Sequence, residues 1–510
     1  MAVSPEDSSE QQGSAQPSGN SHTLLIRSML KNASMLSLSI AITIPLGLIP
    51  KILVPRYLGS EASGILFFGE TFPMLILPFM SLGIPDYISK NIPSRPEHAH
   101  EIFDSVLKFA SISGLLLLGV IAAYMALMGH DQRTIAITII TAATQYFTLL
   151  CLNIYQPFFV ALSHIRFTSL LNVISRSINA MIILGLLIGG FGITWIAAGG
   201  LIAQVATLAI WRRQAKAIRM VGAGFNPLLL KGILSSSLLY FASGLMGKIN
   251  GSIDSAMLER FTSFEEIGLY AASARLSSVF MLFIPLFGQA FFPDMNRLFA
   301  SDRNGYQVMM QRSLRTILAM TLPLAVFFTG FGRDAVVMVF GKDFVAAGQM
   351  VMSFGPNLVV SYLAVFLGFH SFCTSTGRVV ATVVGTGCVV NLLGDFLFIR
   401  FGYQMLGHGG GGTGAAAATL LTQSVECMLF LRLSKIKFVD RALMAKMALA
   451  LFPCGLLVAL DAAWYGLPIV QRIFIYLTFV PVYLFIVGLV KSQDIKYLMV
   501  IFRRFKGSTP

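Results

Sequence analysis

Residues 105–127 read SVLKFASISGLLLLGVIAAYMAL and contain one charged side chain, that of Lys108. An α-helix rises about 1.5 Å per residue, so a run of this length is long enough to cross a hydrocarbon core about 30 Å thick. Comparable apolar runs recur along nearly the whole chain, separated by short stretches that carry charges, glycine or proline. This pattern predicts a protein built from transmembrane helices.

The composition of the whole chain agrees with that prediction. Of the 510 residues, 55% are hydrophobic and 12% are charged, and the mean hydropathy is +0.76. Soluble domains carry about 25% charged residues. We therefore expect an all-α polytopic membrane protein with about fourteen transmembrane helices. The expected spans are 33–54, 64–85, 105–127, 134–162, 167–189, 193–212, 232–257, 267–293, 312–331, 347–373, 377–399, 412–432, 442–463 and 469–490.

The net charge of +14 comes from basic residues in the short segments between the apolar runs. Most of them fall on one side of the membrane if the N-terminus is cytoplasmic, as the positive-inside rule requires. We therefore expect a multi-pass protein of the plasma (inner) membrane with both termini in the cytoplasm. A nucleic-acid-binding protein would gather its basic residues on a folded polar domain, so we expect no nucleic-acid partner. Residues 1–22 have the polar composition of a disordered cytoplasmic tail, and residues 493–510 form a basic one.

The chain contains an internal repeat. A shift of 204 residues aligns residues 24–64 with residues 228–268 without a gap, and shifts of 212 and 219 continue the match further along. The matched pairs are Arg56 and Arg260, Tyr57 and Phe261, Glu61 and Glu265, Gly64 and Gly268, Arg166 and Arg378, Asn179 and Asn391, Thr194 and Thr413, and Gln204 and Gln423.

The repeat predicts the domain organisation. Each repeat holds six expected helices, an even number, so both halves have the same orientation in the membrane. We expect an N-lobe at residues 23–215, a C-lobe at residues 225–435 and two additional transmembrane helices at residues 440–492. Parallel repeats related by an axis along the membrane normal are a transporter architecture, with the substrate site at the repeat interface.

The expected outer loops are short and offer no catalytic group. Asp131, Glu265 and Glu266 are interpreted as solvated loop acids, and the glycine run 409–412 as a flexible connection. The five cysteines have no CxxC spacing and no GxxxxGK[ST] motif is present, so neither a metal site nor direct use of ATP is indicated. We expect a protein that is not an enzyme and that has no catalytic residues and no bound cofactor.

Charged side chains inside a membrane are costly and usually face the bundle interior or a wet cavity. Lys248 and Arg275 are expected at similar depth on consecutive helices, so their repulsion requires an anionic neighbour. That neighbour is either the carboxylate of Glu70 or an anionic ligand.

A second polar stripe lies on another expected helix. Arg176 falls near mid-membrane, and its helical spacing places it on one face with two asparagines. Such a stripe suits the wall of a hydrated cavity. The candidate cavity residues are therefore Arg176, Lys248, Arg275, Glu70, Asn172 and Asn179.

Intramembrane carboxylates are also candidates for ion coupling. We assign this role to Asp254 and Glu70, with H⁺, Na⁺ or the membrane potential as the driving force. Structural ion pairs between helices are the alternative interpretation of these two acids and of the cations near them. Asp395 and Glu426 lie near the ends of their expected helices, where snorkelling or a structural pair is the favoured interpretation.

Several stretches resemble the polysaccharide-transport branch of the multidrug/oligosaccharidyl-lipid/polysaccharide flippase (MOP) superfamily, which includes O-antigen flippases. They are VPRYLG at 54–59, GIP at 83–85, IDSAML at 253–258, IGLYAASARL at 267–276 and FGKDF at 340–344. The resemblance covers about residues 25–435, and the block from Asp254 to Arg275 is its most specific part.

The resemblance implies two six-helix lobes around a V-shaped cavity, often with two extra helices. It implies flipping of a lipid-linked (polyprenyl-pyrophosphate) oligosaccharide to the outer leaflet by alternating access, in the synthesis of a cell-surface polysaccharide. Arg176, Lys248 and Arg275 would then bind the pyrophosphate. The expected partners are the lipid-linked oligosaccharide, the bilayer and, as an open expectation, a glycan polymerase or glycosyltransferases.

Three alternatives stay open. Drug-exporting relatives commonly carry a coupling carboxylate in the first helix, and residues 33–54 contain none, which disfavours a cation-coupled exporter of small molecules without excluding it. Flippases of the lipid-linked peptidoglycan precursor share the helix count and the cationic cavity. A membrane enzyme or scaffold of glycan assembly would require catalytic loop residues that the sequence does not offer.

Overall fold

The computed structural model describes residues 19–94, 96–222, 224–281, 292, 294–374, 377–434 and 441–487, and this part of the chain is all helical. The first half contains α1 (Gly19–Thr71), α2 (Pro73–Ile76), α3 (Ile84–Asn91), α4 (Ala99–Leu127), α5 (Gln132–Leu150), α6 (Gln156–Ala161), α7 (Ile165–Ile188) and α8 (Ile193–Ala217). The second half contains α9 (Pro227–Phe261), α10 (Phe264–Met281), α12 (Arg303–Phe340), α13 (Ala347–Thr374), α14 (Gly377–Leu406) and α15 (Gly410–Leu433). The last helices are α16 (Arg441–Ala459), α17 (Asp461–Gly466) and α18 (Ile469–Ile486).

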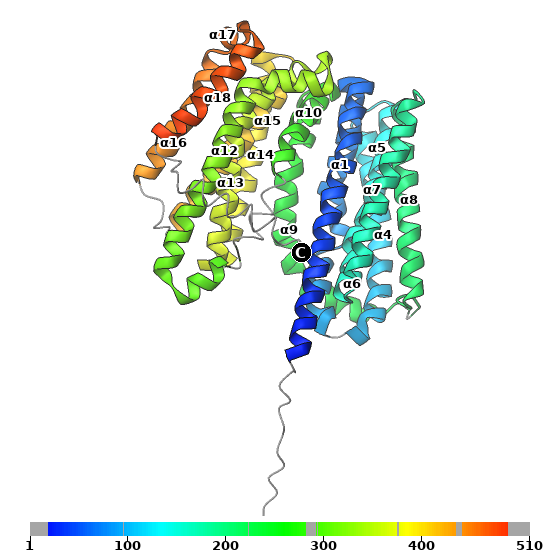
Figure 1. Cartoon of the computed structure of the whole chain (residues 1–510). Coiled ribbons are helices and arrows are strands. Elements are labelled where there is room, and N and C mark those ends of the chain that lie inside the picture. Colours follow the sequence, from blue (N-terminus) through cyan, green and yellow to red (C-terminus); the bar gives the residue numbers. More distant parts are fainter. Residues whose placement is uncertain are drawn as a thin grey trace, which may run out of the picture.

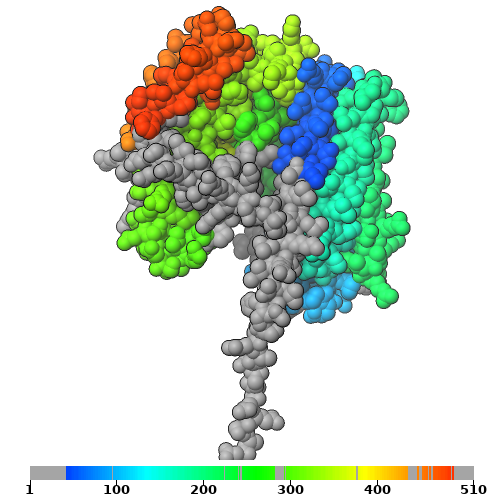
Figure 2. All heavy atoms as spheres, viewed as in Figure 1, coloured from blue at the N-terminus to red at the C-terminus, as the bar shows by residue number. Residues whose placement is uncertain are grey.

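The two halves form two helical lobes that stand side by side, and α16 and α18 lie on the far side of the second lobe (Figure 1 and Figure 2). We call α1–α8 the N-lobe and α9–α15 the C-lobe. The described part of each of the fourteen predicted spans is largely helical, although the span 64–85 is divided among the end of α1, α2 and the start of α3. In the described part of the chain, nine spans meet a length and hydropathy criterion for crossing a membrane. The all-α membrane architecture predicted from the sequence is confirmed.

Helix boundaries are the least accurate part of the prediction. Several helices continue past the predicted spans, for example α12, which runs from Arg303 to Phe340. The apolar run marks the part of a helix in the bilayer, whereas the helix itself continues into the aqueous layer. The short helix α3 was not predicted, and residues 19–22 of the predicted N-terminal tail belong to α1. The remainder of that tail and the tail at 493–510 lie outside the described residues.

The helix α1 contains the first predicted span and the start of the second, which are joined by a turn at one glycine. Gly59 has φ 82° and ψ 178°, a conformation that residues with a Cβ rarely adopt. Lys51 precedes this turn and Glu70 follows it, yet the side chain of Arg275 contacts both. The two residues therefore lie close together and at a similar distance from the turn. The chain therefore reverses at Gly59, and the two arms of α1 run antiparallel.

The lobes touch through a glycine crossing between α1 and α10. A Cβ on Gly64 would lie 1.7 Å from the carbonyl oxygen of Phe264, and a Cβ on Gly268 would lie 1.8 Å from that of Ser60. Gly64 and Gly268 are matched in the sequence repeat, and the same shift matches Ser60 with Phe264. The contact is therefore symmetric, as expected for parallel repeats related by an axis between the lobes.

Further contacts join the lobes at the same end, which we call the contact end. Arg56 of α1 donates from Nη1 to the carbonyls of Met338 and Val339 at the end of α12, at 3.2 Å each. On the N-lobe side, His130 Nε2 lies 2.7 Å from Glu259 Oε1 of α9.

The C-terminal helices dock on α12 through a cluster of aromatic and charged side chains. Arg472 of α18 donates two hydrogen bonds to Asp334, at 2.6 and 3.1 Å, and its guanidinium lies 4.8 Å from the centre of the Tyr465 ring. Trp464 donates from its indole N–H to the carbonyl of Gly330. The pair of helices is thus fixed to the C-lobe at the contact end.

Candidate functional site

The first candidate site lies where α10 of the C-lobe meets α1 of the N-lobe. Arg275 donates from Nη1 to the carbonyl of Lys51 at 3.2 Å, and its Nη2 lies 3.8 Å from Oε2 of Glu70. The guanidinium also lies 5.5 Å from the centre of the Phe67 ring. Arg275 is 10% exposed and Glu70 is 39% exposed. The ion pair considered from the sequence is therefore present, and it bridges the two lobes.

Arg176 of α7 approaches the same helix. Its Nη1 lies 3.9 Å from the position that a Cβ would occupy on Gly47, so the guanidinium packs on the exposed backbone of α1. Gly47 and Lys51 are four residues apart and lie on one face of the helix. The structure thus brings two guanidinium groups, those of Arg176 and Arg275, to one face of α1 about one turn apart. With one carboxylate beside them, the group carries a net positive charge.

The other predicted cavity residues have no described contact with this group. Asn172 and Asn179 are half-buried on α7. Lys248 is exposed on α9, and no described contact joins it to Arg275 or Glu70. Of the two cations, Arg275 is the one that Glu70 contacts.

The second candidate site is a buried polar cluster inside the C-lobe. Asp254 of α9 is 8% exposed and accepts hydrogen bonds from the hydroxyl of Tyr270 and from Nδ2 of Asn391, the latter at 3.1 Å. The same Nδ2 lies 3.4 Å from Oδ2 of Asp395, and Thr422 donates to Oδ1 of Asn391 at 3.2 Å. Four helices, α9, α10, α14 and α15, supply these five side chains.

The structure corrects the interpretation of Asp395 as a snorkelling residue. Asp395 is 0% exposed, because α14 continues to Leu406 and leaves this acid in the interior of the helix. The sequence also missed Tyr270 and Thr422 as its neighbours in the cluster. Both are ordinary core residue types, and nothing in their local spacing distinguishes them from packing residues.

The chemistry of this cluster favours a cation. Asp254 and Asp395 share one amide donor, and two carboxylate charges so close in a buried site repel each other strongly. Among the described residues, Oδ1 of Asp395 has no hydrogen-bond partner. The atoms that could bind a cation here are oxygens of carboxylate, amide and hydroxyl groups, which fit a proton or a hard cation such as Na⁺. Charge balance thus requires a bound proton or cation.

The structure also corrects the interpretation of the predicted loop acids and of the glycine run. Glu266 is 0% exposed, and its carboxylate accepts from the backbone N–H groups of Gly409 and Gly412 at 2.9 Å each. Gly410 begins α15, and a Cβ there would lie 2.2 Å from the carbonyl oxygen of Gly402. The glycines therefore allow close helix packing and expose N–H groups to Glu266.

Asp131 is exposed, as predicted, but it also caps α5. Its carboxylate accepts from the backbone N–H groups of Arg133 and Thr134. Hydrogen bonds from the side chain and the backbone of Thr134 hold the pKa of Asp131 below its usual value. The role of this acid is local.

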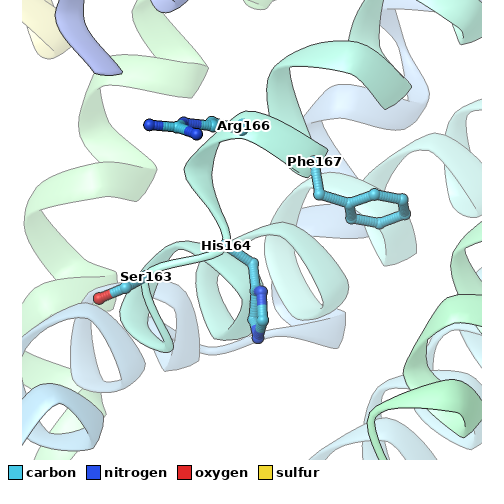
Figure 3. Close-up of a pocket in the computed structure, with 4 residues that line it drawn as sticks. All are labelled: Ser163, His164, Arg166 and Phe167. Atoms are coloured by element: carbon cyan, nitrogen blue, oxygen red, sulfur yellow. The ribbon is translucent and has the colours of Figure 1, made fainter. Parts of the chain in front are cut away.

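A shallow cavity of about 340 Å³ lies at the start of α7, at the end opposite to the contact end. It is lined by Ser163, His164, Arg166 and Phe167, and Figure 3 shows that these side chains point in different directions. Because no common point receives the polar groups, we assign no site to this cavity.

Comparison with known proteins identifies the family. The family model "Polysaccharide biosynthesis protein" matches residues 29–299, which is more than half of the chain. No curated protein sequence matches.

Solved structures show the same fold. The lipid II flippase MurJ in an inward closed conformation has 17% identity and a TM-score of 0.69, covering 88% of this chain and 98% of that one. An inward-facing multidrug resistance MATE family transporter of the MOP superfamily has 16% identity and a TM-score of 0.61, covering 79% and 94%. An outward-facing form of such a transporter has 14% identity and a TM-score of 0.54, covering 80% and 96%. The resemblance drawn from the sequence is confirmed: this chain belongs to the polysaccharide biosynthesis protein family, and it has the fold of membrane flippases and transporters of the MOP superfamily.

Proposed function

We propose that this protein moves a lipid-linked oligosaccharide, carried on a polyprenyl pyrophosphate, from the cytoplasmic to the outer leaflet of the plasma membrane. The observation that carries the proposal is the meeting of Arg176 and Arg275 on one face of α1, at the boundary between the lobes. Guanidinium groups form bidentate hydrogen bonds with phosphate oxygens, so this group suits a pyrophosphate. Membership of a polysaccharide biosynthesis family and the fold of a lipid II flippase support the choice of substrate class.

The proposal assigns an orientation to the molecule. Most basic residues between the predicted apolar spans fall on the side of the N-terminus, so we assign the contact end to the outside and both termini to the cytoplasm. The cavity that the family resemblance implies between the lobes would then open to the cytoplasm, where the sugar is attached to its carrier. Alternating access requires the contacts between α1 and α10 to open while the opposite end closes.

The proposal also assigns the coupling site. Glu70 is engaged by Arg275, whereas Asp254 and Asp395 share a buried cluster that needs a cation for charge balance. We therefore place the coupling of H⁺ or Na⁺ at Asp254 and Asp395. In purified protein, Na⁺ or acidification should raise the Tm, because a cation that binds only the folded state stabilises it. Asp395→Asn should abolish this shift, and an unchanged shift in that variant would remove the coupling site from the proposal.

The substrate is tested by the accumulation of lipid-linked oligosaccharide, measured by leaflet, in cells depleted of the protein. We expect build-up in the cytoplasmic leaflet, rescued by the wild-type protein but not by Arg275→Glu. Arg297→Glu is the matched control, because Arg297 is 74% exposed and pairs only with Asp294 among the described residues. Rescue by Arg275→Glu would contradict the proposed pyrophosphate site.

A charge exchange separates substrate binding from a structural ion pair. The double variant Glu70→Arg with Arg275→Glu keeps both charges at the lobe boundary but moves the cation from α10 to α1. If the pair is only structural, this exchange restores export. If Arg275 binds the pyrophosphate, export stays lost although the protein folds and inserts.

The same assay decides between the alternatives. Accumulation of the lipid-linked peptidoglycan precursor in place of an oligosaccharide would assign that precursor as the substrate. Unchanged lipid-linked intermediates together with a new sensitivity to cationic dyes would assign the protein to small-molecule export.

A further inference from the structure

Glu426 is a buried carboxylate in α15 that the proposed transport cycle does not yet use. Glu426 is 9% exposed, and no hydrogen bond or ion pair joins its carboxylate to another described residue. Among the described residues, the titratable groups that interact electrostatically with it are the thiols of Cys388 on α14 and Cys427 on α15. No basic side chain in the described part of the chain neutralises it, so Glu426 is not the snorkelling or paired acid that the sequence suggested.

The carboxylate occupies a space that only a glycine leaves open. A Cβ on Gly387 of α14 would lie 2.1 Å from Oε1 of Glu426, so the carboxylate rests directly on the backbone of α14. Gly385, two residues away on the same helix, does not share this feature. A Cβ there would lie 3.6 Å from the sulfur of Met246, an ordinary contact distance. The missing side chain at Gly387 is thus specific to the place of the carboxylate.

The register of α14 and α15 connects Glu426 with the buried polar cluster. Gly387 and Asn391 are four residues apart on α14, and Thr422 and Glu426 are four residues apart on α15. Thr422 and Asn391 are hydrogen-bonded to each other at 3.2 Å. Glu426 therefore lies one helical turn, about 6 Å along the axis, from the pair that holds the two aspartates.

Asp395, Asn391, Thr422 and Glu426 form a column of polar side chains between α14 and α15. The column runs from Asp395 toward Leu433, which is at the end opposite to the contact end. Glu426 lies about 10 Å from the end of α15 by the helical rise. The orphaned Oδ1 of Asp395 lies at the inner end of the column.

We propose that Glu426 is a proton relay between the cytoplasmic side and the Asp254–Asp395 cluster. A single carboxylate beside two thiols lacks the oxygen ligands of a Na⁺ site, so a proton is the cation it can hold. In the net step, one proton leaves Glu426 and one carboxylate of the cluster becomes a carboxylic acid, and Glu426 remains as a carboxylate until the cytoplasmic side protonates it again. This role rests on the proposed coupling at Asp254 and Asp395.

The test is infrared difference spectroscopy on the purified full-length protein, titrated from alkaline to acidic pH. The C=O band of a protonated carboxylic acid reports each buried acid directly. We expect Glu426→Gln to lose one titrating band, Glu426→Asp to keep one, and Asp395→Asn to lose a different one. Gly387→Ala should shift the Glu426 band, because the added methyl group displaces the carboxylate. Gly385→Ala is the control and should leave it in place.

The relay itself is tested by the rate at which the aspartate band appears after a rapid drop in pH. In Glu426→Gln this rate should fall about tenfold or more, as for the loss of a positioned proton-transfer group. An equal rate in Glu426→Gln and wild type would overturn the relay, and so would a Glu426→Gln spectrum that has lost no band.

Neither measurement uses a glycan. If lipid-linked oligosaccharide did not build up in the cytoplasmic leaflet of depleted cells, the proposed substrate would be wrong. The relay would still be decided by these spectra. A spectrum in which Asp395→Asn loses no band would instead show that the cluster holds no exchangeable proton, and the relay would fall with it.

Discussion

At the scale of single residues, the burial of the acids differs most from the prediction. Glu265 and Glu266 are adjacent in the sequence and were both expected to be solvated. Both residues belong to α10. Glu265 is half exposed, whereas Glu266 is fully buried against the first turn of α15. Their neighbours in sequence are the same, so only the position of α15 decides which acid is buried. That position is set by a contact between residues more than a hundred apart.

Replacing Glu266 by alanine tests this contact. The change leaves the N–H groups of Gly409 and Gly412 without their acceptor in a buried site. We expect a loss of about 2–3 kcal/mol in the free energy of unfolding, the cost of unpaired buried donors. Thermal unfolding in detergent measures it, with Glu265→Ala as the matched control. Equal melting temperatures for the two variants would contradict the assigned role of Glu266.

At the scale of helices, the glycines explain how the elements approach each other. The sequence suggested flexibility for the glycine run at 409–412, but glycines in helices of membrane proteins commonly allow close packing. A Cβ on Gly414 would lie 2.1 Å from the carbonyl oxygen of Phe398, so α14 and α15 pack backbone to backbone. The repeat had already matched Gly64 with Gly268, yet it could not show that the two residues touch. The repeated spacing in the sequence shows that two residues hold equivalent positions in the two halves. Whether they touch depends on how the two helices lie relative to each other.

The crossing of α1 and α10 is tested by Gly268→Ala. The new methyl group would overlap the carbonyl of Ser60, a backbone atom that cannot rotate away. We expect the lobes to separate at the contact end, with a longer distance between spin labels at Ile188 and Met405, which are exposed on opposite lobes. The native cysteines must first be replaced.

Gly119→Ala on α4 is the matched control, because a Cβ there meets no atom within 4 Å. It should leave the distance unchanged and, by helix propensity, change stability by at most about 1 kcal/mol. A label distance in Gly268→Ala equal to that of the control would show that the crossing does not hold the lobes together.

At the scale of the whole molecule, a few contacts hold one end of the two lobes together. Beside the glycine crossing, His130 lies 2.7 Å from Glu259, and Tyr124 donates to the same carboxylate at 3.3 Å. Glu259 is 5% exposed, so these contacts are shielded from water. In the proposed cycle this end must open, and its contacts then determine the ratio of closed to open molecules.

Glu259→Gln should shift that ratio toward molecules open at the contact end. The variant keeps the shape of the side chain but removes the charge that His130 and Tyr124 contact. A hydrogen bond to a charged group contributes about 1.5–3 kcal/mol, and about 1.4 kcal/mol corresponds to a tenfold change in an equilibrium. The same spin-label pair measures the two populations. If Glu259→Gln leaves them unchanged, the contact does not determine the closed state.

The sequence alone determined the class of the molecule, the positions of its helices and the equivalence of its halves. These features depend on local properties, since a long apolar run must cross the bilayer as a helix and a repeat is visible as a repeated spacing. The tertiary structure decided which polar groups meet. Arg176 and Arg275 converge on α1, Asp254 joins Asp395, and Glu426 rests on a glycine of another helix. The partner of a buried charge lies on a different helix, and only the packing of the helices selects it.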